Sequence, residues 1–294
     1  MIKKVGVIGV GTMGQGIAEM LAKNSLDVLV LENSADRLEH AMHMIEVSLD
    51  KQIEKWAITS SEKKLILSRI QPINKVDELS DCDLIIESIT EDLEAKKEVF
   101  KQLDQVTDAS TILASNTSSL SLTEIASVTR SPERVIGMHF IHPVSKVDLV
   151  EIVRGLKTSD ETVESLKQFA EAIQKKSVMV FESPGFVTTR LICLFINEAL
   201  HVLEEGVATA EDIDLAMRNG YSFKYGPFQM ADHFGLDSVQ AALENMFREY
   251  GDLRYRPSFT LKKMVRAGQL GVKTGVGFFK YDTDGDRSNE STRN

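Results

Sequence analysis

Short apolar runs alternate with amphipathic stretches through the first half of the chain. The runs cover residues 5–8, 28–31, 84–87, 111–114 and 135–138, and they read as strands buried in a parallel sheet. Two further strands are predicted at 149–153 and 178–181, flanking a helix near 160–175. Capping boxes are predicted where Thr59 precedes Glu62 and where Ser121 precedes Glu124. This alternation predicts an α/β fold with a Rossmann-type doubly wound sheet.

The pattern changes at Ser183-Pro184-Gly185, beyond which strand-like alternation almost disappears. Helices are predicted at about 185–205, 210–219, 226–249 and 258–268, separated by glycine or proline. We therefore expect a sheet domain over residues 1–184 and a smaller all-helical C-terminal domain over residues 185–281. A polar tail, expected to be mobile, covers residues 282–294.

The first helix of the C-terminal domain has a nearly continuous apolar face, which is wider than one partner surface usually needs. This face predicts a homodimer or higher homo-oligomer through the helical domain, and a helix buried in its own domain's core is the alternative. The residues concerned are Leu191, Leu194, Phe195, Leu200 and Leu203.

Composition narrows the class of protein. The 294 residues are 43% hydrophobic and 27% charged, as in a globular protein with a core. A net charge of −10 argues against nucleic acid and anionic membrane as partners, because both attract basic surfaces. Cys82 and Cys193 lie far apart and predict reduced thiols in a cytoplasmic protein. Glycines interrupt the N-terminal apolar run, so no signal peptide or membrane span is expected.

A glycine motif follows the first predicted strand directly and opens a helix. In Gly9-Val10-Gly11-Thr12-Met13-Gly14, the first glycine permits a tight turn and the second lets the backbone approach a pyrophosphate. The third lets the helix pack closely on the strand. The helix N-terminus then offers N–H groups to the phosphates, so the motif predicts a dinucleotide site. A purely structural glycine turn is the alternative.

Glu32 closes the second predicted strand, 18 residues after Gly14. A carboxylate at this position accepts hydrogen bonds from the ribose hydroxyls and repels a 2′-phosphate. NAD is therefore the expected cofactor, and the first domain is an NAD-binding domain. Glu91 and Lys96 follow the strand at 84–87, at the sheet edge where ligands bind. Their spacing alone favours solvated charges at the start of a helix.

A second group of polar residues lies at the same edge of the sheet. Asn116 and Ser118 belong to a polar run that follows one strand, and His139 lies at the end of the next. Glu151 sits twelve residues later, inside an apolar run. A buried carboxylate needs a partner, and a histidine is a natural one, because the pair selects one ring tautomer. Spacing alone leaves open a core histidine and an unrelated edge-strand glutamate.

From Gly6 to Tyr281 the chain resembles the L-3-hydroxyacyl-CoA dehydrogenases, in particular the 3-hydroxybutyryl-CoA dehydrogenases. The resemblance lies in VGVIGVGTMGQGIA, DCDLIIESITEDLEAKKEVF, ILASNTSSLSLTEIA, GMHF, LVEIVRG, SPGFV, YGPF and LGVKTGVGFF. It implies an enzyme that transfers a hydride between NAD and C3 of a 3-hydroxyacyl-CoA in fatty-acid metabolism and β-oxidation. It also implies His139 as the general base, Glu151 as its partner and Ser118 as a contact to the substrate oxygen.

The resemblance also implies binding residues. Glu32 would bind the ribose, and Glu91, Lys96, Asn116, Ser118 and Lys273 would lie on the nicotinamide side of the cofactor. Ser48 and Lys55 would contact the CoA portion of the substrate.

Three residues depart from the family's pattern. Thr189 replaces an asparagine that would help to bind the reacting oxygen, and His142 replaces an asparagine before Pro143. Glu32 replaces an aspartate. The first two lie in the substrate pocket, so Thr189 remains a candidate catalytic residue and His142 a candidate substrate contact. They keep open a dehydrogenase of a free hydroxy acid, such as carnitine or gulonate. A catalytically silent nucleotide-binding protein is a third hypothesis.

Other residues suggest less chemistry. His139 and His142 could be interpreted as a metal pair, but no third ligand accompanies them, so no metal is expected. Trp56 is interpreted as a packing residue.

Overall fold

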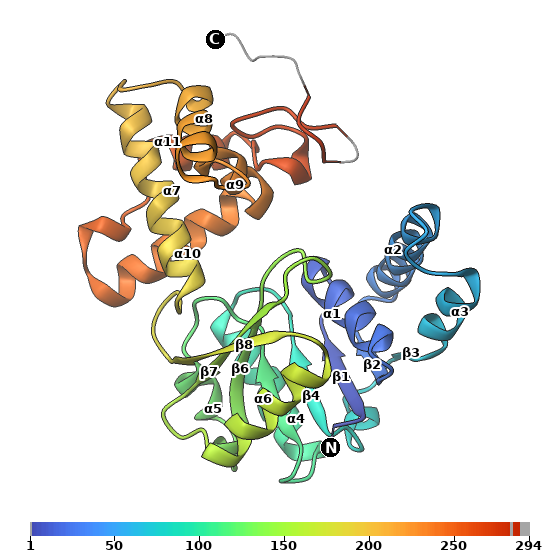
Figure 1. The fold of residues 1–294 in the computed structure, drawn as a ribbon. Coiled ribbons are helices and arrows are strands. Elements are labelled where there is room, and N and C mark those ends of the chain that lie inside the picture. The colour runs from blue at the N-terminus through green and yellow to red at the C-terminus, as the bar shows by residue number, and fades with distance from the viewer. Residues whose placement is uncertain (1, 283–284, 289–294) are drawn as a thin grey trace. The chain divides into compact units, whose positions relative to one another are not determined.

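The structure is a computed structural model that describes residues 2–282 and 285–288 (Figure 1). The chain forms two compact units, Met1–Ser183 and Pro184–Asn294.

The first unit contains a sheet of eight strands in the order β3-β2-β1-β4-β5-β6-β7-β8. Neighbouring strands are parallel except for β6 and β7, which are antiparallel. The chain passes from β3 across the sheet to β4. The two neighbours of β1 are therefore β2, from the segment before this crossover, and β4, from the segment after it. The strands are β1 Lys4–Ile8, β2 Asp27–Leu31, β3 Ile70–Ile73, β4 Leu84–Glu87, β5 Ile112–Ser115, β6 Val135–Phe140, β7 Leu149–Arg154 and β8 Lys176–Phe181.

Helices cover both faces of this sheet (Figure 1). Successive strand side chains alternate between two apolar cores: Val5 and Val7 face one, while Ile8 faces the other. Helices α1, α2 and α6 contribute to the first core and α4 and α5 to the second. This arrangement confirms the predicted Rossmann-type fold. The helices are α1 Thr12–Lys23, α2 Ala35–Glu54, α3 Ser60–Ser68, α4 Leu93–Val106, α5 Leu122–Ala126 and α6 Asp160–Ala172, with short 3-10 turns η1 Val76–Leu79 and η2 Pro132–Arg134.

Two local predictions for this unit need correction. Strand β3 was not predicted, because the exposed Gln71 and Pro72 interrupt its apolar run. The capping box at Thr59 and Glu62 is present, with both side chains hydrogen-bonded to the backbone. At Ser121 only the serine half forms, because the Glu124 carboxylate is paired with Lys97 instead.

The second unit is helical, as predicted. Its elements are α7 Thr188–Glu204, α8 Ala210–Tyr221, α9 Pro227–Phe234, α10 Leu236–Tyr250 and α11 Phe259–Arg266, with 3-10 turns η3 Leu253–Tyr255 and η4 Val272–Thr274. The single helix predicted at 226–249 is wrong. Gly235 has φ +90 and separates α9 from α10, because this backbone conformation cannot continue a helix.

Two buried aspartates organise the second unit. Asp232 accepts hydrogen bonds from the N–H groups of Phe278 and Phe279, each at 2.9 Å, and from the Tyr281 hydroxyl at 3.0 Å. Asp214 accepts from the N–H of Phe228 at 2.8 Å. Burial raises the pKa of Asp232 to about 6. These bonds attach the segment after η4 to α9.

The polar tail is only partly described. Within it, the N–H of Ser288 donates to the Lys280 carbonyl at 3.0 Å, and Arg287 forms an ion pair with Glu211. The described tail residues are therefore hydrogen-bonded to the second unit, while residues 283–284 and 289–294 lie outside the description.

Much of the apolar face of α7 belongs to the core of its own unit. Leu200 is fully buried, and Phe195 stacks on Phe223 with ring centroids 5.4 Å apart. Leu191 is 62% exposed. The alternative prediction, that α7 is buried in its own domain's core, therefore holds for part of the apolar face. Leu191 is the clearly exposed residue of this face.

None of the helices in the described part of the chain combines the length and the apolar character that crossing a lipid bilayer requires.

Candidate active site

Most of the predicted site residues of the first unit follow its parallel strands. Strands β1, β2, β4, β5 and β6 run in the same direction, so their carboxyl ends meet at one edge of the sheet. The glycine turn follows β1, Glu32 follows β2, Glu91 follows β4, and the polar run with Asn116 and Ser118 follows β5. Residues distant in sequence are thereby brought to one edge.

The glycine turn has the geometry that a dinucleotide requires. Gly9 has φ +83, and a Cβ on Gly14 would lie 1.9 Å from the Gly9 carbonyl oxygen, so neither position accepts a side chain. A Cβ on Gly11 would meet no atom within 4 Å. Helix α1 begins at Thr12, followed by Met13. Its N-terminus has no side-chain cap, and its first turn contains no acidic residue. The open space and the uncapped N–H groups fit a pyrophosphate.

Glu32 joins the end of β2 to this turn. One carboxylate oxygen accepts from the N–H of Val10 at 3.3 Å, and the other lies 2.7 Å from Nη2 of Arg37. Arg37 was not predicted as a site residue. From the first turn of α2, the Arg37 guanidinium compensates part of the negative charge of Glu32. The sequence does not distinguish Arg37 from an ordinary exposed arginine.

The centre of the site is a histidine–glutamate pair. Antiparallel pairing sets His139 of β6 directly opposite Glu151 of β7, and Nδ1 of His139 lies 2.7 Å from Oε2 of Glu151. Glu151 is 0% exposed and His139 is 7% exposed. If the carboxylate accepts the Nδ1–H, then Nε2 carries the lone pair that can accept a proton.

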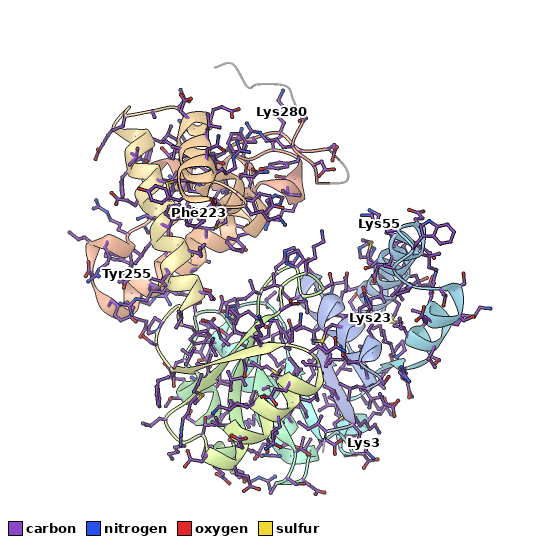
Figure 2. The ribbon with its side chains drawn as sticks, in the orientation of Figure 1. Lys3, Lys23, Lys55, Phe223, Tyr255 and Lys280 are labelled. Atoms are coloured by element: carbon purple, nitrogen blue, oxygen red, sulfur yellow. The ribbon has the colours of Figure 1, made fainter. Side chains whose placement is uncertain are left out.

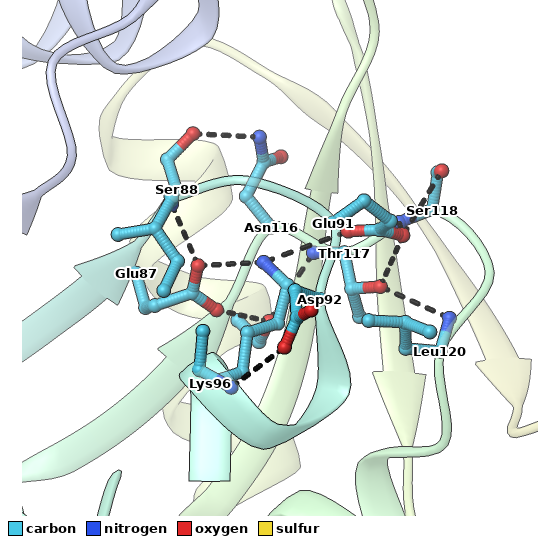
Figure 3. A network of polar contacts seen from close by, with 12 residues as sticks. Glu87, Ser88, Glu91, Asp92, Lys96, Asn116, Thr117, Ser118 and Leu120 are labelled. Atoms are coloured by element: carbon cyan, nitrogen blue, oxygen red, sulfur yellow. Dashed lines mark hydrogen bonds and ion pairs between the residues drawn. The ribbon is translucent and has the colours of Figure 1, made fainter. Parts of the chain in front are cut away.

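Asn116 connects the strand that carries His139 to the neighbouring loops. Its Oδ1 accepts from the N–H of Phe140 at 2.9 Å, and its amide donates to Oγ of Ser88 at 3.2 Å (Figure 3). Both ends of the side chain are therefore engaged within the protein. Asn116 thus links the segments that follow β4 and β5 to the end of β6.

Glu91 holds the loop that carries Ser118. A single oxygen, Oε1, accepts from the Thr117 hydroxyl at 2.6 Å and from the N–H groups of Ser118 and Ser119 at 3.0 and 3.1 Å (Figure 3). Burial raises the pKa of the Glu91 carboxyl, but Lys96 and these hydrogen bonds outweigh that effect and lower it below its ordinary value. The carboxylate thereby fixes the backbone around Ser118.

Lys96 lies below this loop in a buried cluster of charges. Its Nζ is 2.6 Å from Glu87 Oε1 and 3.5 Å from Glu91 Oε2, and its side chain is 1% exposed. The interpretation of Lys96 as a solvated charge is therefore wrong. The second oxygen of Glu87 accepts from the Ser115 hydroxyl at 2.6 Å. Glu87 and Ser115 were not predicted as site residues, although a glutamate that ends an apolar strand needs a buried partner.

The remaining predicted residues are distributed over other parts of the chain. Ser48 lies on α2, and the exposed Lys55 is the C-cap of this helix, about two helical turns further along. His142 is exposed at the start of the loop after β6. Thr189 and Lys273 belong to the second unit, where Lys273 Nζ lies 2.6 Å from both carboxylate oxygens of Asp237.

The environment of Trp56 differs most from the prediction, which interpreted it as a packing residue. Trp56 is 95% exposed, so it is not a packing residue.

Across residues 2–282 and 285–288, no group of three or more His, Cys, Asp or Glu side chains could hold a metal ion.

A dinucleotide-type glycine turn and a buried histidine–glutamate pair at one sheet edge define a nucleotide-dependent dehydrogenase. Two family models agree with this class. Residues 4–183 match the 3-hydroxyacyl-CoA dehydrogenase NAD binding domain, and residues 185–281 match the 3-hydroxyacyl-CoA dehydrogenase C-terminal domain. The chain belongs to the 3-hydroxyacyl-CoA dehydrogenase family, and its first domain is that family's NAD-binding domain.

Individual relatives cover nearly the whole chain. It is 42% identical over 281 residues to a 3-hydroxybutyryl-CoA dehydrogenase of Bradyrhizobium diazoefficiens, covering 96% of each chain. It is 42% identical over 279 residues to one of Clostridioides difficile, covering 95% of this chain and 99% of the relative. The crystal structure of (S)-3-hydroxybutyryl-CoA dehydrogenase PaaH1 from Ralstonia eutropha matches with a TM-score of 0.90 and 40% identity, covering 96% of this chain and 100% of that one.

Proposed function

We propose that this protein interconverts a 3-hydroxyacyl-CoA and the corresponding 3-ketoacyl-CoA, with NAD as the hydride partner. The favoured substrate is a short acyl chain such as 3-hydroxybutyryl-CoA, because relatives that carry this name align over nearly the whole chain. The observation that carries the proposal is the contact of 2.7 Å between His139 and Glu151, in the same sheet that carries the nucleotide turn.

In this proposal His139 moves the proton. In the oxidation, neutral Nε2 takes the proton of the C3 hydroxyl group, while NAD, when bound, accepts the hydride from C3. Glu151 stabilises the imidazolium that forms, because its carboxylate lies against Nδ1. In the reduction the same imidazolium returns the proton to the 3-keto oxygen.

Ser118 is the proposed hydrogen-bond donor to the reacting oxygen. Hydrogen bonds aimed at a developing negative charge contribute roughly 3–4 kcal/mol in other enzymes. Glu91 positions this donor, because its Oε1 binds the N–H groups of Ser118 and Ser119. The same oxygen accepts from the Ser118 hydroxyl at 3.3 Å, so this hydroxyl would turn from Glu91 to the reacting oxygen. Thr189 is proposed as a second, weaker donor, since one hydroxyl replaces the two N–H groups of an amide.

The cofactor and CoA contacts are also proposals. Glu32 is assigned to the adenosine ribose, and Glu91, Lys96, Asn116, Ser118 and Lys273 to the nicotinamide side. Because Glu91, Lys96 and Asn116 are all engaged within the protein, we propose that they act mainly by shaping the loops there. Ser48, Lys55 and His142 are the proposed substrate contacts.

We propose a homo-oligomer that forms through the helical unit, with Leu191 in the contact, since this α7 residue is 62% exposed. Cys82 and Cys193 are free and buried, which agrees with a reducing compartment such as the cytoplasm. Fatty-acid metabolism by β-oxidation or its reversal is the proposed setting.

The experiment is NADH oxidation by the purified protein with acetoacetyl-CoA, with longer 3-ketoacyl-CoA thioesters, and with dehydrocarnitine as a free acid. We expect turnover of acetoacetyl-CoA and none of the free acid. Turnover of the free acid alone would favour the second candidate, which rests on Thr189 and His142. Binding of NADH without turnover of any of these compounds would contradict a dehydrogenase function.

A further inference from the structure

Arg37 is ion-paired to the carboxylate that we assign to the adenosine ribose of the cofactor. Its Nη2 lies 2.7 Å from Oε1 of Glu32, and the same oxygen accepts from the N–H of Asn33 at 3.0 Å. The other oxygen of Glu32 accepts from the N–H of Val10, in the glycine turn, at 3.3 Å. Backbone N–H groups therefore hold both oxygens of Glu32 without the help of Arg37.

The two members of this pair differ in their freedom to move. The Glu32 side chain is 12% exposed, whereas that of Arg37 is 67% exposed. Among the described residues, Nη2 is the only guanidinium atom of Arg37 with a hydrogen-bond partner, and Glu32 is the only carboxylate within 4.0 Å of it. An arginine presents several N–H groups in a planar fork. The remaining N–H groups of Arg37 can therefore bind a second acceptor.

The charge of the pair determines which adenosine riboses the site tolerates. A lone carboxylate after the second strand accepts hydrogen bonds from the ribose hydroxyls and repels a 2′-phosphate, whereas an arginine nearby accommodates one. Here the guanidinium compensates the carboxylate charge from a distance of 2.7 Å. The repulsion that would exclude a 2′-phosphate is therefore largely cancelled.

Turning Arg37 from Glu32 to a phosphate is favourable. An exposed ion pair typically shifts an equilibrium by less than about fivefold. A hydrogen bond from a guanidinium to a charged phosphate oxygen contributes about tenfold or more. The phosphate contact is therefore the stronger of the two, and Glu32 keeps its backbone partners when Arg37 leaves.

We propose that Arg37 is a ligand for the 2′-phosphate of NADP(H), so that the protein accepts NADP(H) as a second hydride partner beside NAD. With NAD, Arg37 stays on Glu32, and the carboxylate binds the ribose hydroxyls. With NADP, the guanidinium turns to the phosphate. This inference rests on the proposed assignment of Glu32 to the ribose, and it is independent of the acyl group that the protein accepts.

This site is separate from the proposed CoA contacts. Arg37 lies in the first turn of α2, and Lys55, which Figure 2 labels, is the C-cap at the other end of the same helix. The two residues are roughly 27 Å apart along the helix axis. A variant of Arg37 should therefore change nucleotide binding without changing the KM for acetoacetyl-CoA.

Calorimetry with ADP-ribose and 2′-phospho-ADP-ribose tests the contact without turnover, because the two compounds differ only in the phosphate. For the unaltered protein we expect dissociation constants within about tenfold of each other. Arg37→Ala should weaken the phosphorylated compound at least about tenfold more than the other. A protein that binds ADP-ribose but shows no detectable binding of 2′-phospho-ADP-ribose would overturn the proposal.

Two further variants separate a phosphate ligand from a residue that only orients Glu32. Glu32→Gln removes the competing charge, so 2′-phospho-ADP-ribose should then bind more tightly than ADP-ribose. Arg254→Ala is the matched control, because Arg254 is a similarly exposed arginine, paired with Asp252 at 2.6 Å. It should leave both constants unchanged. If Arg37→Ala weakens both compounds equally, Arg37 only orients Glu32 and the proposal is wrong.

Reduction of acetoacetyl-CoA with NADH and with NADPH connects this contact to the reaction. We expect both cofactors to support turnover, and Arg37→Ala to raise the KM for NADPH about tenfold more than that for NADH. Turnover with NADH alone would refute the second cofactor and leave the proposed function intact. Binding of both ADP-riboses by a protein that turns over no 3-ketoacyl-CoA would refute the proposed function and leave the Arg37 contact intact.

Discussion

Both units bury carboxylates, but they give them different partners. In the first unit Glu151 lies against an imidazole and Glu87 against a lysine. In the second unit Asp232 accepts hydrogen bonds from peptide N–H groups and a tyrosine hydroxyl. Among the described residues, neither Asp232 nor Asp214 forms an ion pair within 4.0 Å.

The partner determines what a buried carboxylate can do. A histidine can gain and lose a proton near neutral pH, and a carboxylate beside it adjusts that equilibrium. Peptide N–H groups do not titrate in this range, so the partners of Asp232 cannot exchange a proton with it, and its hydrogen bonds hold the segment after η4 in place. We therefore assign chemistry to the first group and architecture to the second, and the following variants test that division.

The largest effect is expected for His139→Gln. Glutamine keeps hydrogen-bonding capacity but cannot act as a base, so turnover of 3-hydroxybutyryl-CoA should fall at least about a hundredfold. The dissociation constant for NADH, measured by its fluorescence, should change little. A variant that no longer binds NADH would show that His139 supports the fold of the nucleotide site.

Glu151→Gln should have a smaller effect with a different signature. An amide oxygen still accepts the Nδ1–H, but the imidazolium loses its negative partner. The imidazolium is therefore less stable, so the rise of the oxidation rate with pH should shift to lower pH, with kcat about tenfold lower. The test is the pH dependence of kcat, and an unchanged profile would remove Glu151 from the proton transfer.

Glu91→Ala tests the support of Ser118. Loss of its hydrogen bonds frees the backbone of the Ser118 loop, so kcat should fall about tenfold with little change in NADH affinity. Glu94→Ala is the control, because Glu94 lies three residues after Glu91, in the first turn of α4, where it forms a surface pair with Lys97. If NADH affinity falls in Glu91→Ala while kcat is retained, Glu91 acts as a cofactor contact instead.

Asp232→Asn should affect stability, and mainly its pH dependence. The pKa of Asp232 is raised from 3.8 to about 6, so the folded state holds a proton that the unfolded state has lost. Stability from this group is therefore complete below pH 3.8 and is lost as the pH rises through about 6. The loss is up to about 3 kcal/mol by linkage.

Melting temperatures at several pH values give the measurement. The asparagine variant should show a flatter decline across this range than the unaltered protein, while Asp252→Asn, at an exposed ion pair, should not. Parallel curves for Asp232→Asn and the unaltered protein would contradict the assignment.

Features that depend on repeated apolar patterns could be predicted from the sequence. The strands that carry Glu87 and His139 are continuous apolar runs, and the glycine turn needs residues without Cβ atoms. The apolar run around Glu151 indicated that its carboxylate needs a partner, whereas the resemblance to the family identified His139 as that partner. The structure adds the register, which places the two residues directly opposite one another.

Features that depend on individual side-chain directions were not predicted. Lys96 looks like any charged residue of a helix until its 2.6 Å contact with Glu87 is known. Trp56 is apolar, and its exposure follows from a helix end that the sequence pattern does not reveal. Strand β3 was missed because Pro72 contradicts the usual strand composition.

Because His139 and Glu151 pair across β6 and β7, changes in the loop between these strands can occur in evolution separately from changes in the pair itself. The register of β6 and β7 holds the proton-transfer pair, whereas the intervening loop, residues 141–148, contributes neither partner. Lys175 anchors this loop through the carbonyls of Val144 and Val147, each at 2.6 Å. A loop of another length or composition that keeps this anchor can therefore be exchanged as a module. Because His142, a proposed substrate contact, belongs to this loop, such exchanges would change that contact without moving the histidine–glutamate pair.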